Sequence, residues 1–258
     1  MGDKLSRHNF MNMNNYVEFT NQKLVDIYDA VNPIGEYADF YTSLAKTHQV
    51  EKVIDLGCGT GLLSNYFIDA GFAVIGIEPA PAMLEKARQK YGNSAEWLVG
   101  STEALDKNMQ ADMVVMSGHV AQFFLENTEW QTALKNIRDA LKPGGILAFE
   151  SRNPAVRPFT NWPSKDRPGS IDKTPLGKVA WWPSDVEYDG VFATYRLNYR
   201  FIKTGEIIVS DNKLRFRTAE EMSSSLEQAG FKIKQLYGDW DRRVFSSDSE
   251  EMIFIAQK

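Results

Sequence analysis

The chain has 258 residues, of which 43% are hydrophobic and 24% charged, and it carries a formal net charge of -5 with a pI near 5.4. This length and apolar content allow a sizeable buried core and suit one α/β domain with an insertion. The acidic balance offers no basic face to neutralise a phosphate backbone, so we expect a small-molecule partner rather than a nucleic acid.

Cysteine usage and hydropathy indicate a cytoplasmic protein. Cys58 is the only cysteine in the sequence, which excludes an intrachain disulfide and fits a reducing compartment. No apolar run approaches the ~18 residues needed to cross a bilayer, and the Asn-rich start lacks the apolar core of a signal peptide. We therefore expect a cytoplasmic location and no membrane partner. The oligomeric state is left open.

The first part of the chain alternates short apolar runs with helix-like stretches, which is typical of βαβ units and a mainly parallel sheet. Residues 81–91 and 129–141 each place apolar side chains on one helical face, and Lys142-Pro143-Gly144-Gly145 ends the second helix. The predicted strands are residues 53–56, 73–77, 95–99, 113–116 and 145–149.

The α/β rhythm breaks between residues 153 and 217. The first half of this segment, through Pro183, is rich in proline and lysine and predicts an irregular covering segment. The second half alternates, and residues 204–206 offer a turn, so we expect an antiparallel β unit. The residues expected to share one face of this unit are Val191, Ala193, Tyr195, Leu197, Tyr199 and Phe201.

The α/β pattern returns near residue 218. Thr218 and Glu221 have the spacing of a capping box, and two strands are expected at residues 231–237 and 252–256. Before Val50 we expect one or two helices. The predicted layout is an N-terminal helical segment (1–49), an α/β domain (50–152 and 218–258) and an inserted cap (153–217).

A glycine-rich loop follows the first predicted strand. Residues 53–61 read Val-Ile-Asp-Leu-Gly-Cys-Gly-Thr-Gly, and these glycines let the backbone turn tightly and approach a ligand. The spacing is G-x-G-x-G rather than the G-x-G-x-x-G of dinucleotide sites, which argues against a nicotinamide-dependent dehydrogenase. Asp55 would repel a pyrophosphate but attract an ammonium group. S-adenosylmethionine carries an ammonium and no phosphate.

Glu78 follows the second predicted strand, seventeen residues after Gly61. An acidic side chain at this place can accept hydrogen bonds from both hydroxyls of a ribose. Taken alone, Glu78 is better explained as an exposed loop carboxylate. Together with the glycine loop, it favours an adenosine-containing ligand.

Three segments together resemble the class I S-adenosylmethionine-dependent methyltransferases: residues 53–61, residues 76–84, and residues 141–145. The resemblance implies a Rossmann-like, seven-stranded, mainly parallel sheet with helices on both faces, whose last strand runs antiparallel. It also implies S-adenosylmethionine as the cofactor, with no metal. The residues that we expect at the cofactor are Asp55, Gly57, Cys58, Gly59, Gly61, Glu78, Pro79, Met83, Ser101, Thr102, Glu103 and Ser117. The family often has an aspartate near the adenine, and here Ser101-Thr102-Glu103 stands instead.

The acceptor side of the site has weaker signals. Methyl transfer is an in-line displacement, so positioning can supply much of the rate without a dedicated catalytic residue. His119, after the fourth strand, is the candidate base, and a histidine that merely packs is the alternative. Arg152 is a candidate for an acidic group of the acceptor, or for a structural salt bridge. Trp181 and Trp182 of the cap are candidates for the acceptor pocket.

We therefore expect a methyltransferase acting on nitrogen or oxygen of a small molecule. The alternative is a binding or regulatory protein that keeps the cofactor fold without turnover. RNA methylation lacks support, because the sequence has no basic surface or RNA-binding module.

Overall fold

The computed structural model describes residues 16–258, so residues 1–15 of the predicted N-terminal segment lie outside the described part. The larger sheet consists of β1 (Lys52–Leu56), β2 (Ala73–Glu78), β3 (Glu96–Val99), β4 (Ala111–Met116), β5 (Leu141–Arg152), β10 (Lys232–Tyr237) and β11 (Glu251–Gln257). Within residues 16–258 these seven strands run in the order β10-β11-β5-β4-β1-β2-β3. Every strand predicted for the α/β part is present, with bounds shifted by a few residues at most.

The strand directions confirm the predicted Rossmann-like sheet. β1 pairs in parallel with β2 and with β4, whereas β11 runs antiparallel to both β5 and β10. In a parallel sheet the carboxyl ends of neighbouring strands meet at one edge. The loops after β1, β2, β3 and β4 therefore converge there.

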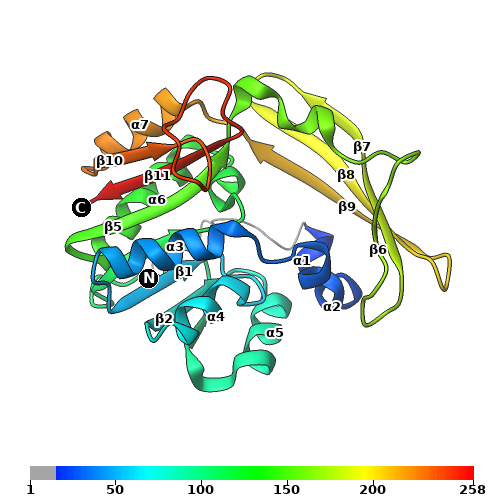
Figure 1. The fold of residues 1–258 in the computed structure, drawn as a ribbon, viewed down its shortest axis with the longest axis horizontal. Helices are drawn as coiled ribbons and strands as arrows, with labels where there is room; N and C mark the ends of the chain where they lie inside the picture. The colour runs from blue at the N-terminus through cyan, green and yellow to red at the C-terminus, as the bar shows by residue number, and fades with distance from the viewer. Residues whose placement is uncertain (1–15) are drawn as a thin grey trace, which may run out of the picture.

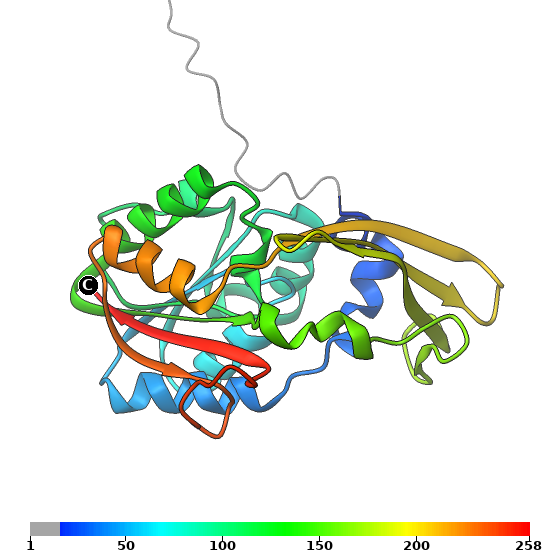
Figure 2. The same cartoon turned by 90° about the horizontal axis from the view of Figure 1, so that it is seen from above.

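Helices cover both faces of this sheet. Val53 of β1 packs in one cluster with α3 (Glu36–Thr47) and α4 (Leu62–Asp69), next to α5 (Pro81–Tyr91). Its neighbour Ile54 packs in another cluster with α6 (Asn127–Ala140) and α7 (Ala219–Gln228), because adjacent strand residues point to opposite faces. Figure 2 shows α3 on one side and the α6–α7 pair on the other. The predicted capping box of Thr218 and Glu221 is present at α7.

The predicted antiparallel β cap is also present. It is formed by β6 (Gly169–Ile171), β7 (Val179–Tyr188), β8 (Phe192–Phe201) and β9 (Ile207–Arg215), in that order across the sheet (Figure 1). The predicted irregular segment through Pro183 is present only in part, because β6 interrupts it and β7 already begins at Val179. Pro183 fits a strand here because β6 ends its pairing at Trp181, so no strand on that side needs the missing N–H.

Two N-terminal helices, α1 (Val17–Thr20) and α2 (Gln22–Val31), lie between the cap and α5 (Figure 1). Leu24 and Ile27 of α2 pack against Tyr199 and other apolar residues of the cap. On the opposite side, Lys86 and Lys90 of α5 form ion pairs of 2.8 and 2.6 Å with Asp26 and Asp29. α2 thus joins the cap to the α/β part of the molecule.

Short 3-10 helices complete the described chain: η2 (Gly92–Ser94), η3 (Thr102–Ala104), η4 (Val120–Phe123), η5 (Pro154–Val156) and η6 (Pro158–Asn161). Among residues 16–258, every helix is too short or too polar to span a lipid bilayer.

Candidate active site

A pocket lies at the edge where the parallel strands of the larger sheet end. It encloses about 570 Å³, including its open mouth. Each neighbouring strand contributes from its carboxyl end: Gly57 follows β1, Glu78 ends β2, Ser101 follows β3 and Ser117 follows β4. Of the residues expected at the cofactor, those that line this pocket are Gly57, Gly59, Glu78, Pro79, Met83, Ser101 and Ser117.

The glycine loop brings its backbone against a neighbouring turn. Gly57 has φ +79°, a conformation that favours glycine, and a Cβ placed there would lie 2.5 Å from Cγ2 of Val120 in η4. The N–H groups of Gly57 and Cys58 donate to the carbonyl oxygen of Ile77 at 2.8 and 3.1 Å. The loop is thereby tied to the end of β2, where Glu78 begins its contacts.

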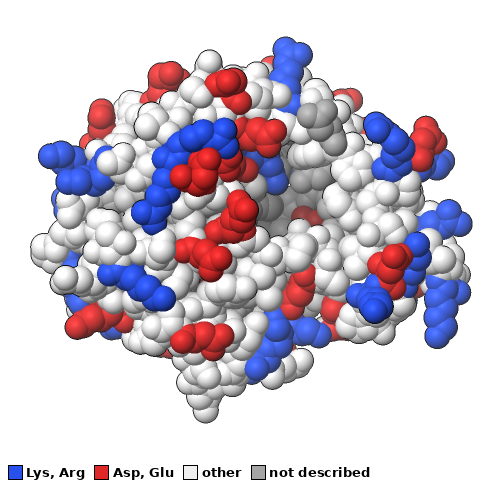
Figure 3. Space-filling view, in the orientation of Figure 1, with Lys and Arg blue, Asp and Glu red and all other residues white. Residues whose placement is uncertain are grey.

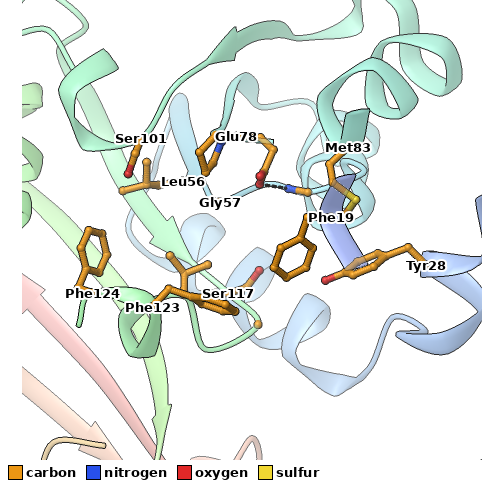
Figure 4. Close-up of a pocket in the computed structure, with 14 residues that line it drawn as sticks. Phe19, Tyr28, Leu56, Gly57, Glu78, Met83, Ser101, Ser117, Phe123 and Phe124 are labelled. Atoms are coloured by element: carbon orange, nitrogen blue, oxygen red, sulfur yellow. Dashed lines mark hydrogen bonds between the residues drawn. The ribbon is translucent and has the colours of Figure 1, made fainter. Parts of the chain in front are cut away.

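Glu78 is held by two backbone donors. Its Oε2 accepts from the Gly59 N–H at 3.0 Å (Figure 4), and its Oε1 accepts from the Ala80 N–H at 2.8 Å. The side chain is almost completely buried, and this burial raises its pKa to about 7 although the two hydrogen bonds oppose the shift. A carboxylate oxygen can accept two hydrogen bonds, so each oxygen keeps room for one further donor.

Asp55 lies beneath the glycine loop rather than on the pocket wall. It shares the face of β1 that α4 covers, and its Oδ2 accepts from the hydroxyl of Ser64 in α4 at 2.6 Å. Burial is the main cause that raises its pKa to about 6. Its Oδ1 is buried and has no hydrogen-bond partner within the described residues. One acceptor atom therefore remains available below the loop.

Four other expected cofactor residues lie outside the pocket lining. Cys58 packs with Leu84 and Trp97, and Gly61 begins α4 with φ +79°. The Thr102 carbonyl oxygen accepts from Asn136 at 3.1 Å, and its hydroxyl is buried. Glu103 accepts from the Ser101 N–H at 2.9 Å. These contacts shape the two loops whose neighbouring residues reach the pocket.

His119 and Arg152 also make contacts away from the pocket wall. The Nε2 atom of His119 lies 3.0 Å from both carboxylate oxygens of Glu251 in β11, and the backbone N–H of His119 donates to Oε1 of Glu150 at 3.0 Å. Arg152 donates to Oε1 of Gln122 in η4 at 2.9 Å. Both residues hold the turn after β4 against β5 and β11, and that turn carries Ser117 and Val120 into the pocket.

Trp181 and Trp182 point to opposite faces of the cap, as adjacent residues of a strand must. Trp181 packs with the cluster that includes α2 and Tyr199, and the backbone of Gly169 lies directly against its ring. Trp182 is 9% exposed and is paired with Asn198 on the other face. The two tryptophans therefore cannot line one acceptor pocket together.

The sequence analysis missed several aromatic residues of the pocket. Phe19 of α1 and Tyr28 of α2 line it together with Phe123 and Phe124 of the η4 turn (Figure 4). The Phe19 and Tyr28 ring centroids are 6.1 Å apart, and those of Phe19 and Phe123 are 5.9 Å apart. No local motif marks these residues, because three separate segments of the chain supply them. The N-terminal helices, rather than the cap, form this wall.

Comparison with known proteins agrees with this geometry. Residues 53–145 match the family model of the methyltransferase domain. Glycine N-methyltransferase of Rattus norvegicus is 29% identical over 177 residues, which cover 62% of this chain and 57% of the relative. The chain thus matches little more than half the length of that relative.

Solved structures share the fold at low sequence identity. A S-adenosylmethionine-dependent methyltransferase from Clostridium acetobutylicum ATCC 824 has a TM-score of 0.77 at 14% identity, covering 91% of this chain and 97% of the other. A sugar N-methyltransferase from Streptoalloteichus sp ATCC 53650 has a TM-score of 0.69 at 16% identity, covering 89% and 90%. With the motif order and the sheet topology, these likenesses show that residues 53–145 are similar to a methyltransferase domain and that the chain has the fold of S-adenosylmethionine-dependent methyltransferases.

Proposed function

We propose that this protein transfers the methyl group of S-adenosylmethionine to a nitrogen or oxygen atom of a small molecule. The observation that carries the proposal is the Glu78 carboxylate, which is buried in the pocket and fixed by the Gly59 and Ala80 N–H groups. A ribose with two free hydroxyls fits the two remaining acceptor positions of such a carboxylate. This pocket chemistry supports S-adenosylmethionine as the ligand.

The other pocket residues fit the remaining parts of the cofactor. Gly57 and Gly59 leave room for the amino-acid end close to the backbone, and the unpartnered Oδ1 of Asp55 supplies negative charge below them. Ser101 lies where an adenine ring extends beyond the ribose, with Thr102 and Glu103 shaping that loop. Cys58 and Gly61 support the loop from behind.

When bound, S-adenosylmethionine supplies an electrophilic methyl group on a sulfonium. Phe19, Tyr28 and Phe123 exclude water from the space beside the pocket and restrict the direction from which an acceptor approaches. His119 and Arg152 act as positioning residues in this proposal, since their side chains are bonded to Glu251 and Gln122. Transfer then depends mainly on alignment of the acceptor atom.

Calorimetry and a transfer assay test the proposal. We expect S-adenosylmethionine and S-adenosylhomocysteine to bind and NAD not to bind. We also expect label from methyl-tritiated S-adenosylmethionine to pass to pooled small amines, phenols or hydroxy acids. Tight NAD binding without a response to S-adenosylmethionine would contradict the cofactor. Binding without transfer to any pool would instead favour a regulatory cofactor-binding protein.

A further inference from the structure

A buried carboxylate lies beside the pocket and plays no part in the cofactor contacts described above. Glu18 of α1 is only 9% exposed. Its Oε2 accepts from the Tyr199 hydroxyl at 3.2 Å, and its N–H donates to Oγ of Ser210 at 3.3 Å. Both partners come from the cap. Within residues 16–258, Glu18 forms no ion pair with any lysine, arginine or histidine.

An unpaired carboxylate in this position is costly for the fold. Buried charges in proteins are normally paired or bonded on all sides. Burial raises the pKa of Glu18 to about 7, and the single bond from Tyr199 only partly opposes that shift. The second carboxylate oxygen, Oε1, accepts no hydrogen bond from the described residues. It is also not one of the completely buried polar atoms that lack a partner. One oxygen thus remains open to a donor.

Tyrosine side chains lie near the Glu18 carboxylate, and one of them reaches the pocket. After burial, the charge of Glu18 is the largest cause that raises the pKa values of Tyr16, Tyr28 and Tyr195. Tyr28 lines the cofactor pocket, as does Phe19, the residue that follows Glu18. Figure 4 shows Phe19 and Tyr28 side by side at the pocket wall. The Glu18 carboxylate therefore lies beside the aromatic wall of the pocket, on the side where α1 meets the cap.

A negative charge among aromatic rings is suited to an ammonium ion. The carboxylate forms a charge-assisted hydrogen bond with it, and ring faces attract its positive charge. A carboxylate or phosphate group would be repelled, and a neutral hydroxyl would leave the charge uncompensated. Figure 3 shows a hollow between the α/β part and the cap, with acidic side chains along its margin and inside it.

We propose that Glu18 binds the acceptor as a protonated amine and takes the proton that blocks its lone pair. This inference rests on the proposed methyltransferase function and narrows its acceptor to an aliphatic amine. The ammonium gives one proton to the Glu18 carboxylate and becomes a neutral amine. Its nitrogen lone pair forms the new N–C bond to the methyl group, while the C–S electron pair stays on sulfur and yields a thioether. Glu18 then releases its proton to solvent.

Sinefungin provides a probe that does not require the natural acceptor. It resembles S-adenosylmethionine but carries a primary amine in place of the methylsulfonium, so its ammonium stands where the methyl group would leave. We expect Glu18→Gln to weaken sinefungin binding roughly tenfold, since a nearby unit charge is lost in a poorly hydrated site. S-adenosylhomocysteine, which has no charge there, should bind the variant and the wild type within about twofold.

Matched variants separate charge from folding. Glu187→Gln removes the same charge from an exposed position of β7 and should leave both affinities unchanged. Tyr199→Phe removes the hydroxyl donor and keeps the ring, so it should preserve the preference for sinefungin. A Glu18→Gln variant that loses both ligands equally, or that keeps the wild-type ratio of affinities, overturns the proposal. Failure of the wild type to bind S-adenosylhomocysteine would instead contradict the proposed function itself.

A pH profile supplies the second measurement. With benzylamine as the trial acceptor and benzyl alcohol as its neutral counterpart, only the amine should accept methyl label. The rate should rise through pH 7 as Glu18 ionises. The titratable groups that face it are Tyr16, Tyr28, Tyr195 and Tyr199, all with pKa values raised by burial, and the Arg152 charge acts on Tyr195. Glu18→Gln should abolish the rise of the rate through pH 7 and lower the rate about a hundredfold or more. Transfer to the alcohol but not to the amine would overturn the assignment.

Discussion

The cofactor side and the acceptor side that we propose for the pocket are built in different ways. On the cofactor side, Gly57, Gly59 and Glu78 come from two consecutive strand–loop units, and a bond of 3.0 Å joins Glu78 to Gly59. On the acceptor side, the bonds join residues that are far apart in sequence. Glu18 and Tyr199 are separated by 181 positions, and Tyr16 and Lys213 by 197. The cofactor side is thus formed by a local sequence motif, whereas the acceptor side is formed by segments that meet only in the folded structure.

This difference has a physical basis. A parallel strand that ends in a glycine turn fixes its own backbone geometry, so a ligand site forms wherever the motif occurs. The aromatic wall instead requires α1, α2 and η4 to meet, and the cap to cover α2 from behind. We call the glycine loop and Glu78 the cofactor wall, and the aromatic residues of α1, α2 and η4 the acceptor wall. We expect substitutions that shift the backbone of the cofactor wall to abolish cofactor binding. Substitutions in the acceptor wall should leave cofactor binding intact.

Gly57→Ala should have the largest effect. The added Cβ meets Cγ2 of Val120 at 2.5 Å while the residue keeps φ +79°, so overpacking and backbone strain combine. We expect a loss of about 2 to 4 kcal/mol in the free energy of unfolding and no measurable cofactor binding. Urea unfolding and calorimetry check this. The control is Gly71→Ala, where φ is +89° but no atom lies within 4 Å of the new Cβ. Equal losses in both variants would show that contact with η4 contributes nothing.

Glu78→Ala should weaken cofactor binding without unfolding the protein. The lost interactions are charge-assisted hydrogen bonds to the ribose, which correspond to roughly 1 to 3 kcal/mol. Glu85→Ala removes an exposed glutamate of α5 and is the matched control. Calorimetry gives both dissociation constants. An unchanged constant in a folded Glu78→Ala protein would make Glu78 a structural residue of the loop.

Cofactor affinity should rise as the pH increases from about 6 to 8. Burial raises the pKa of Glu78 to about 7, so the empty pocket holds a proton in the lower part of this range. Ribose hydroxyls donate to the ionised carboxylate, and binding therefore releases the proton. Affinity is gained as the pH passes through the raised pKa, by up to roughly tenfold. Glu78→Gln should flatten the dependence. A wild-type affinity that falls with pH would contradict the assigned sign.

The cofactor wall was predictable from sequence because its signals are local. The strand bounds, the α5 helix at residues 81–91 and the placing of Gly57, Gly59 and Glu78 all follow from periodicity and glycine spacing. Asp55 shows where this reasoning stops. It stands directly before the loop in the sequence, but the strand period places its carboxylate under α4, where it is bonded to Ser64.

The residues of the acceptor wall could hardly be predicted from the sequence. His119 and Arg152 stand at the expected edge, yet Glu251 of β11 and Gln122 of η4 hold their side chains. Neither partner adjoins them in sequence. Glu18 and Phe19 carry no motif at all, since a buried carboxylate is recognisable only from what packs around it. Long-range pairing of side chains is the information that periodicity lacks.

Substitutions in the cap should have the smallest effect on the cofactor, and a pair of neighbouring tryptophans tests this. Trp181 packs toward α2 and Tyr199, whereas Trp182 points to the opposite face of β7. We expect Trp181→Ala to displace α2 and slow methyl transfer roughly tenfold or more, because alignment is sensitive to small shifts. Trp182→Ala should slow transfer much less. Neither change should alter the free energy of cofactor binding by more than about 0.5 kcal/mol, since the glycine loop lies on other elements.

Urea unfolding must first establish that both variants are folded. Equal loss of transfer in the two variants would mean that the cap acts through its overall stability. Loss of cofactor binding in Trp181→Ala would mean that the two walls are coupled through α2 and its ion pairs with α5.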